Sequence, residues 1–145
     1  MTELEFALNT FYLLMSGALV MWMAAGFTML EAGLVRSKNA SEIVTKNLGL
    51  FSIACVMYLT CGFFIMYPGD SAISSWIPGF SFSYLSLGME GQDMSYGSYS
   101  EASDFFFQVV FVATAMSIVS GAVAERMKLL PFFAFAIILT GFIYP

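Results

Sequence analysis

The 145-residue sequence contains no histidine and only two cysteines, Cys55 and Cys61. The missing histidine excludes a histidine-ligated metal site and a histidine acid or base within these residues. The six-residue spacing of the cysteines places them on different sides of a helix, so we expect two buried thiols and no bridge between them. No glycine-rich phosphate loop and no cluster of metal ligands is present. We therefore predict that the chain is not an enzyme and holds no cofactor or metal.

Charged residues are also scarce. They make up 10% of the chain, whereas hydrophobic residues make up 59%, and soluble domains carry about 25% charged residues. A chain this apolar would expose too much hydrophobic surface to water, so we predict an integral membrane protein. With only five Lys and Arg residues, the sequence has no basic patch for nucleic acid, and we expect no nucleic-acid partner.

Four apolar stretches are candidates for transmembrane helices, which need about 20 residues to cross the hydrocarbon core. They are residues 6–30, 47–67, 105–124 and 129–145. The first follows Glu3 and Glu5 with no basic residue before it, so we interpret it as a retained helix and not as a signal peptide. The fourth ends with the sequence itself and has no polar cap, which is typical of a cut chain. The predicted fold class is an all-α membrane protein, here with four transmembrane helices.

All five basic residues fall in two segments between apolar stretches. They are Arg36, Lys38, Lys46, Arg126 and Lys128. Membrane proteins keep Lys and Arg on the cytoplasmic side. The long connection at residues 68–104 carries only acidic charges. We therefore predict that the N-terminus and the loop 68–104 lie outside and that the two basic turns lie inside. The sequence assigns no function to this loop.

Acidic residues near the basic turns are predicted to be structural. Glu31 and Glu125 each end an apolar stretch, and an arginine follows each of them closely. At a membrane interface, a glutamate in this position usually pairs with the nearby arginine and fixes the turn. Glu42 and Lys46 stand four residues apart, so we expect them to pair on the first turn of the second helix.

Small residues recur on two of the predicted helices. On the first they are Ala18, Ala25 and Ala32, seven residues apart, and on the third they are Ala113, Ser117 and Gly121, four apart. Small residues let membrane helices approach closely. We predict that these two faces are packing faces.

Phe107 and Phe111 stand four residues apart on the third predicted helix and share another of its faces. From the pattern alone, such a pair either contacts lipid, packs in the bundle or forms part of a site. Gln108 lies beside them, and a polar amide at this depth either bonds a neighbouring helix or lines a wet vestibule. The sequence does not separate these alternatives.

Two segments at the ends of apolar stretches carry a family resemblance. Residues 32–39 read AGLVRSKN, and residues 121–128 read GAVAERMK. Between them stands Phe107-Gln108 followed by Phe111. In these segments the chain resembles the N-terminal four-helix portion of the ammonium transporter (Amt/Mep/Rh) family, and the resemblance covers essentially the whole sequence.

This resemblance implies an eleven-helix bundle with an outside N-terminus, assembled as a homotrimer in the plasma membrane or the bacterial inner membrane. It implies uptake of ammonium or ammonia through a hydrophobic pore, and a cytoplasmic PII-type regulator as a further partner. By the same resemblance, Phe111 matches the gate phenylalanine beside the recruitment site and Phe107 matches its aromatic neighbour, with Gln108 next to them. An aromatic face attracts a cation by about 0.5–2 kcal/mol.

The family pattern continues beyond this sequence. The family's recruitment-site tryptophan, structural aspartate, outer serine and two pore histidines would all follow Pro145. We therefore expect an N-terminal fragment of a transporter. Two alternatives stay open, namely an ammonium-sensing membrane module coupled to a signalling domain and a structural four-helix membrane protein. The residues that follow Pro145 would distinguish them.

Overall fold

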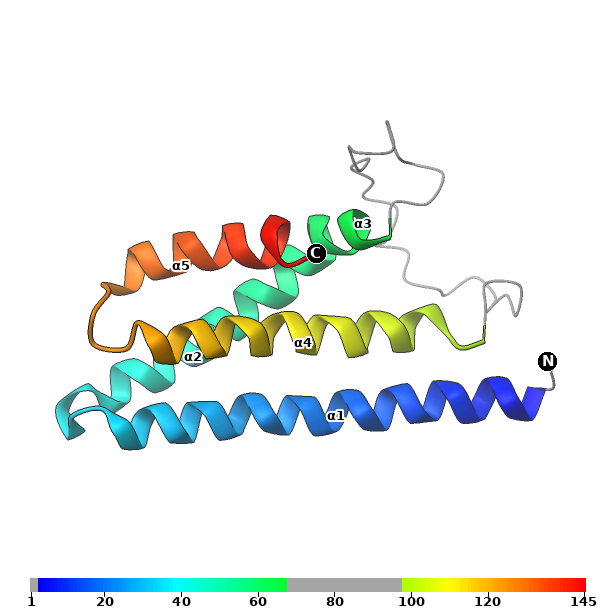
Figure 1. The fold of residues 1–145 in the computed structure, drawn as a ribbon, viewed down its shortest axis with the longest axis horizontal. Helices are drawn as coiled ribbons and strands as arrows, with labels where there is room; N and C mark the ends of the chain where they lie inside the picture. The colour runs from blue at the N-terminus through cyan, green and yellow to red at the C-terminus, as the bar shows by residue number, and fades with distance from the viewer. Residues whose placement is uncertain (1–2, 68–97) are drawn as a thin grey trace.

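The computed structural model is a helical bundle and describes residues 3–67 and 98–145 (Figure 1). Helix α1 spans Glu3–Leu34, and a 3-10 turn, η1 (Ser37–Asn39), leads into α2 (Ala40–Met57). A π-helical turn, η2 (Tyr58–Gly62), joins α2 to α3 (Phe63–Met66). Helix α4 spans Glu101–Ala122, and α5 (Leu129–Ile138) continues into a second π-helical turn, η6 (Leu139–Ile143). Most of the loop predicted at 68–104 lies outside the described residues.

Within residues 3–67 and 98–145, three helical segments are long and apolar enough to cross a membrane, and they are Glu3–Leu34, Ser37–Met66 and Glu101–Ala122. The fourth apolar segment, Leu129–Ile143, is shorter. Helix α4 begins inside the stretch predicted as loop, with Glu101 and Asp104 in its first turn. Acidic side chains there suit the positive end of the helix dipole, which explains the early start. The predicted all-α class is confirmed for the described part of the chain.

Helices α1 and α4 run side by side in the same direction, and their mutual contact is the largest in the bundle (Figure 1). Helix α2 crosses them in the opposite direction and packs on both, while α5 packs on α2. The two basic turns, between α1 and α2 and between α4 and α5, therefore lie at the same end of the bundle. The beginnings of α1 and α4 lie at the other end.

The packing face of α1 is formed by Gly17, Ala24 and Glu31, which stand seven residues apart and are the buried residues of this helix. The face predicted one residue later is wrong at its centre, where Ala25 is exposed, while Ala18 and Ala32 are half-buried. One residue rotates a helix face by about 100°. Gly17 explains the choice: a Cβ there would lie 2.7 Å from Cε1 of Phe106, so a side chain would hold α4 away.

On α4, the predicted packing residues Ala113 and Ser117 are buried, whereas Gly121 is exposed. The buried core on this helix extends along Val109, Val110, Val112 and Met116. Helix α4 packs on both α1 and α2 and is the most deeply buried of the three long segments. Residues on its different faces therefore meet different neighbours.

The two π-helical turns, η2 at the end of α2 and η6 at the end of α5, contact each other. The Cys61 thiol approaches the Gly141 carbonyl oxygen at 3.6 Å, and Cβ atoms on Gly62 and Gly141 would each lie 2.7 Å from a neighbouring side chain. The Thr60 hydroxyl donates to the Val56 carbonyl at 3.0 Å, which satisfies a backbone group near the turn. Cys55 and Cys61 are both free thiols.

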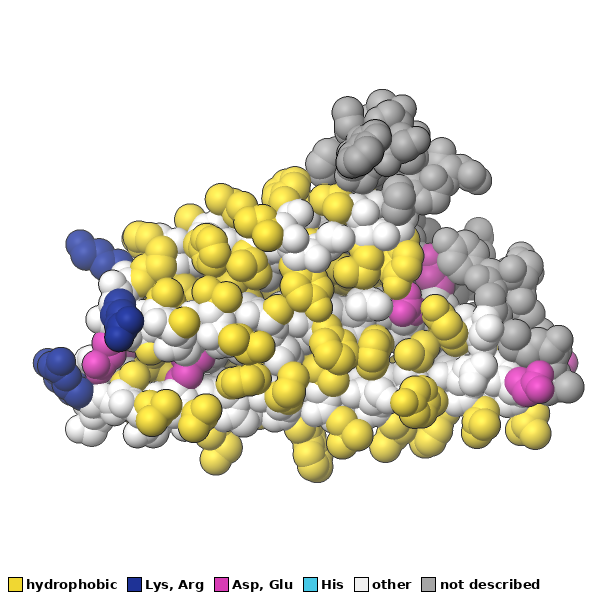
Figure 2. Space-filling view, viewed as in Figure 1, with side chains coloured by type: hydrophobic (Ala, Val, Ile, Leu, Met, Phe, Trp, Pro, Cys, Tyr) yellow, Lys and Arg dark blue, Asp and Glu magenta, His cyan; other side chains and the backbone are white. Residues whose placement is uncertain are grey.

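Charge separates along the long axis of the bundle (Figure 2). Lys and Arg side chains gather at the end that holds the two basic turns, and acidic side chains lie at both ends. Apolar side chains cover the length between them. Many large hydrophobic residues on α1 are exposed, among them Leu4, Tyr12, Trp22 and Met29. This surface suits an apolar environment and not water.

Candidate functional site

Three consecutive phenylalanines near the start of α4 point to different neighbours. The Phe105 ring lies 5.5 Å from the rings of both Tyr58 and Phe63, between centroids. The Phe106 ring instead packs at Gly17 on α1. Phe107 follows on the next face. Phe105 thus packs in an aromatic cluster with the α2–α3 segment, Phe106 contacts α1, and Phe107 lies on a third face of α4.

Phe107 and Phe111 form an edge-to-face pair. Their ring centroids are 4.8 Å apart and the ring planes are inclined by 60°. Both side chains are partly buried, so each ring keeps a face that a neighbour can contact. Aromatic pairs prefer this arrangement because the positive edge of one ring meets the negative face of the other. The helical spacing therefore places two π faces next to each other in the half of α4 away from the basic turns.

Gln108 lies beside this pair and contacts the chain that follows α3. Its Nε2 donates a hydrogen bond of 3.3 Å to the Tyr67 hydroxyl. Of the two sequence alternatives, the structure therefore gives this amide a partner from a neighbouring segment. The side chain is partly exposed, so this bond does not close it off from a ligand.

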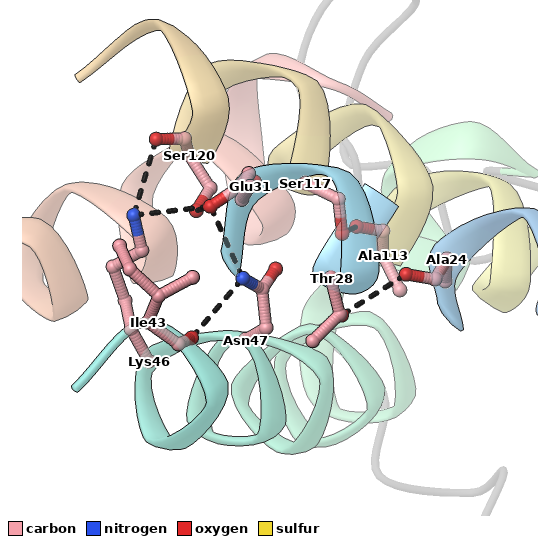
Figure 3. A network of polar contacts seen from close by, with 9 residues as sticks. All are labelled: Ala24, Thr28, Glu31, Ile43, Lys46, Asn47, Ala113, Ser117 and Ser120. Atoms are coloured by element: carbon pink, nitrogen blue, oxygen red, sulfur yellow. Dashed lines mark hydrogen bonds and ion pairs between the residues drawn. The ribbon is translucent and has the colours of Figure 1, made fainter. Parts of the chain in front are cut away.

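A second polar cluster, which the sequence did not predict, lies toward the basic end of the bundle (Figure 3). Lys46 Nζ is 3.4 Å from Glu31 Oε2, and the two side chains are only 8% and 4% exposed. Lys46 Nζ also donates to the Ser120 carbonyl oxygen at 3.1 Å and lies 5.1 Å from the centroid of the Phe132 ring. The predicted pairing of Lys46 with Glu42 is wrong, because Lys46 turns inward from α2 to α1 and α4.

Glu31 Oε2 is the centre of this cluster. It accepts hydrogen bonds from Asn47 Nδ2 at 3.1 Å and from the Ser120 hydroxyl at 2.9 Å. Glu31 therefore ties α1 to α2 and α4, and its ion-pair partner is Lys46 and not the arginine that follows it in the sequence. One sequence feature could have predicted this cluster. Lys46 and Asn47 stand side by side at the start of an apolar stretch, and buried polar groups need polar partners.

Glu125 joins the two basic turns. Its Oε1 accepts hydrogen bonds from the Arg36 backbone N–H at 3.1 Å and from Asn39 Nδ2 at 2.8 Å, and Oε2 lies 3.8 Å from Arg36 Nε. The hydrogen bond from the Arg36 backbone, with that from Asn39, lowers the pKa of the Glu125 carboxyl. Its φ of 59° is in the left-handed region, which sharpens the turn after α4. Glu125 therefore has the predicted structural role, but its partner is Arg36 from the other basic turn and not the arginine that follows it in the sequence.

Three cavities adjoin the polar cluster. One of about 270 Å³ lies at the basic end and is lined by Lys46, Glu125 and Arg126 among others. Grooves of about 300 Å³ and about 250 Å³ flank α1 on its α2 and α4 sides. Phe107 and Phe111 do not line any of these three. In residues 3–67 and 98–145, no three His, Cys, Asp or Glu side chains are grouped so that they could hold a metal ion.

Known proteins resemble this sequence over nearly its whole length. The ammonium transporter family model matches residues 11–145. The chain is 34% identical over 148 residues to the ammonium transporter Amt2 of Methanocaldococcus jannaschii, covering 100% of this chain and 33% of that protein. It is 37% identical over 139 residues to the ammonium transporter 1 member 3 of Solanum lycopersicum, covering 96% of this chain and 28% of that protein.

A third relative, the ammonium transporter Amt2 of Archaeoglobus fulgidus, is 34% identical over 145 residues, which cover 97% of this chain and 28% of that protein. The chain thus spans about a third or less of the length of the relatives that it matches. No solved structure matches it significantly. The family match covers most of the sequence, including both basic turns and the Phe107–Phe111 pair. The chain belongs to the ammonium transporter family.

Proposed function

We propose that the protein carries ammonium or ammonia across a membrane through a hydrophobic pore, and that it is a transporter and not an enzyme. Its family membership over residues 11–145 is the observation that carries this proposal. Relatives with a matching segment are named ammonium transporters in an archaeon and a plant, and putative ammonium transporters in a bacterium and an animal. The present chain would supply the first part of the pore.

The proposed membrane is the plasma membrane, or the inner membrane in a bacterium, with the N-terminus outside. In this proposal the segments 6–30, 47–67, 105–124 and 129–145 cross the membrane and the loop 68–104 lies outside. Lys and Arg side chains gather at one end of the bundle, which supports this orientation. We further propose a homotrimer, with a cytoplasmic PII-type regulator that would meet the basic end.

Phe111 is the proposed gate residue, with Phe107 and Gln108 beside it. A cation that approaches an aromatic face is attracted by the negative charge of the ring system, and this attraction grows when water is excluded. The edge-to-face pair, with centroids 4.8 Å apart, offers such a face at the outer half of α4. The Gln108 amide, which follows Phe107 in the sequence and donates to the Tyr67 hydroxyl, has a carbonyl oxygen that can accept from an N–H donor or a hydrated cation.

Replacement of Phe111 tests this role in the whole protein. We expect Phe111→Ala to change ammonium uptake or the exclusion of potassium, measured as ¹⁵N-ammonium and rubidium uptake in cells that lack other ammonium transporters. Phe11→Ala is the matched control, since Phe11 is 60% exposed on the outer surface of α1. If Phe111→Ala matches the wild type in uptake and in exclusion, Phe111 is not part of the site.

A further inference from the structure

Asp104 is a buried acidic residue at the outer end of the bundle, which holds the beginnings of α1 and α4. It lies in the first turn of α4 and is only 8% exposed. The Lys and Arg side chains of the described chain gather toward the opposite end. A buried charge normally has a partner of opposite charge or binds a metal ion. The helix dipole favours an acidic group in this turn, but it supplies only about half a charge.

One oxygen of the Asp104 carboxylate is open to a ligand. The Tyr67 hydroxyl lies within hydrogen-bonding reach of Asp104, and it has one proton to donate, so it serves one oxygen. The described part of the chain supplies no second donor to this carboxylate. The oxygen atoms there that are sealed from solvent without a hydrogen bond are Glu31 Oε1 and Asn47 Oδ1. The second oxygen of Asp104 is not one of these, so it can be reached from outside.

Asp104 lies on the same face of α4 as the aromatic pair. At 100° per residue, Phe107, Gln108 and Phe111 all stand within about 60° of it. The helical rise places Phe107 about 5 Å and Phe111 about 10 Å further along the axis. Gln108 also donates to the Tyr67 hydroxyl, at 3.3 Å, so the amide and the carboxylate share one neighbour. A carboxylate, an amide and two aromatic rings therefore follow one another from the outer end of α4 inward.

The chemistry of this face favours a small monovalent cation. The Asp104 carboxylate attracts a cation over a longer range than an aromatic ring does, and Glu101, one turn nearer the start of α4, adds negative charge. An anion would be repelled by both groups. A divalent metal ion needs more oxygen ligands, and the described residues offer no group of three His, Cys, Asp or Glu side chains for one. Ammonium can donate an N–H to Asp104 while it keeps part of its water shell.

We propose that Asp104 recruits ammonium at the outer end of α4, before the cation reaches the Phe107–Phe111 pair. The carboxylate raises the local concentration of the cation and so lowers the external concentration at which uptake saturates. It does not distinguish ammonium from potassium, because its charge attracts both, and that selection is left to the aromatic pair. The inference rests on the proposed transport of ammonium and adds Asp104 to the residues that the cargo meets.

Asp104→Asn in the whole protein tests this role, since it removes the charge and keeps the shape of the side chain. We expect the KM for ammonium uptake to rise about 5-fold or more, the factor that an exposed pair of charges can reach. The maximal rate and the exclusion of rubidium should change little, and Asp104→Glu should restore most of the KM. Glu3→Gln, which removes an exposed acidic charge at the same end, is the matched control. An unchanged KM, an equal rise in Glu3→Gln, or a loss of maximal rate alone would overturn the proposal and leave transport standing.

A crystal structure of the whole protein with thallium(I), a monovalent cation close to ammonium in size, tests binding without transport. We expect anomalous density within about 4 Å of an Asp104 carboxylate oxygen in the wild type and none there in Asp104→Asn. An empty position in the wild type would overturn the proposal, and so would a Lys or Arg from another part of the whole protein paired with Asp104. Density at Asp104 in a protein that takes up no ammonium would support the cation site and overturn the transport proposal instead.

Discussion

Lys46 Nζ lies 3.4 Å from Glu31 Oε2 between helices that are otherwise apolar, and both side chains are almost completely buried. The pair connects α2 to α1 across the basic half of the bundle. Removing one partner would leave the other charge buried with only neutral hydrogen-bond partners, such as Asn47 and Ser120 for Glu31. Such losses typically cost about 3–5 kcal/mol, whereas replacing both partners by apolar groups is often nearly neutral.

We therefore predict that Lys46→Met strongly lowers the stability of the purified protein and that Glu31→Gln, which keeps an acceptor, lowers it less. The double variant Glu31→Leu/Lys46→Met should be more stable than the sum of the losses in its two single variants, Glu31→Leu and Lys46→Met, predicts. Thermal unfolding of the single and double variants in detergent measures the coupling. Glu42→Gln, an exposed change on the first turn of α2, is the control. Additive effects of the single changes would contradict a direct pairing.

Gly17 is predicted to be intolerant of even one methyl group. In Gly17→Ala the new Cβ would lie 2.7 Å from Phe106 Cε1 and 3.5 Å from Phe107 Cα, so the ring or the helix must move. Overpacking of this kind costs about 1–3 kcal/mol. Gly26→Ala on the same helix meets nothing within 4 Å and should leave the Tm unchanged or raise it. Equal behaviour of the two variants in thermal unfolding would show that α1 and α4 do not meet at Gly17.

Acid is predicted to weaken the link between the two basic turns. The pKa of Glu125 is lowered by the hydrogen bonds from Arg36 and Asn39. A carboxyl group with a lower pKa in the folded protein stabilises it above the unfolded pKa of about 4.3 and loses this effect as pH falls through the folded value. The Tm difference between the wild type and Glu125→Gln should therefore shrink from pH 7 to pH 3. Asn39→Ala should reduce the difference at pH 7, and a difference independent of pH would contradict the link.

Cysteine labelling tests the proposed orientation. In a background of Cys55→Ala and Cys61→Ala, we expect Ser98→Cys to react with a membrane-impermeant maleimide in intact cells. Ser37→Cys should react only after the membrane is permeabilised. Both serines are exposed and stand at opposite ends of the bundle, so they are matched in residue type and accessibility. The reverse pattern of labelling would place the N-terminus in the cytoplasm.

The sequence predicted the helices and the family, because these depend on local information. Runs of apolar residues about as long as a membrane is thick, and basic residues between them, are visible without any contact. The i,i+4 spacing also correctly placed Phe107 and Phe111 next to each other, with rings 4.8 Å apart. Their role in transport stays a prediction.

Partners across the bundle were harder to predict. The small-residue face of α1 was predicted one residue too late. The sequence offers small residues seven apart on two neighbouring faces, and only the contact with the Phe106 ring on α4 selects the face of Gly17. Likewise, Glu31, Lys46 and Glu125 each had a plausible partner nearby in the sequence. Each found its partner on another helix or turn, up to 89 residues away.

The sequence by itself determined an all-helical membrane protein of the ammonium transporter family, with its basic residues in two turns, since composition and helical period are properties of single segments. Only the tertiary structure decided that Lys46 enters the bundle to meet Glu31 and that Arg36 meets Glu125. These choices depend on the rotation and approach of α1, α2 and α4. A buried charge takes whichever partner that packing brings within reach, and sequence distance has no part in it.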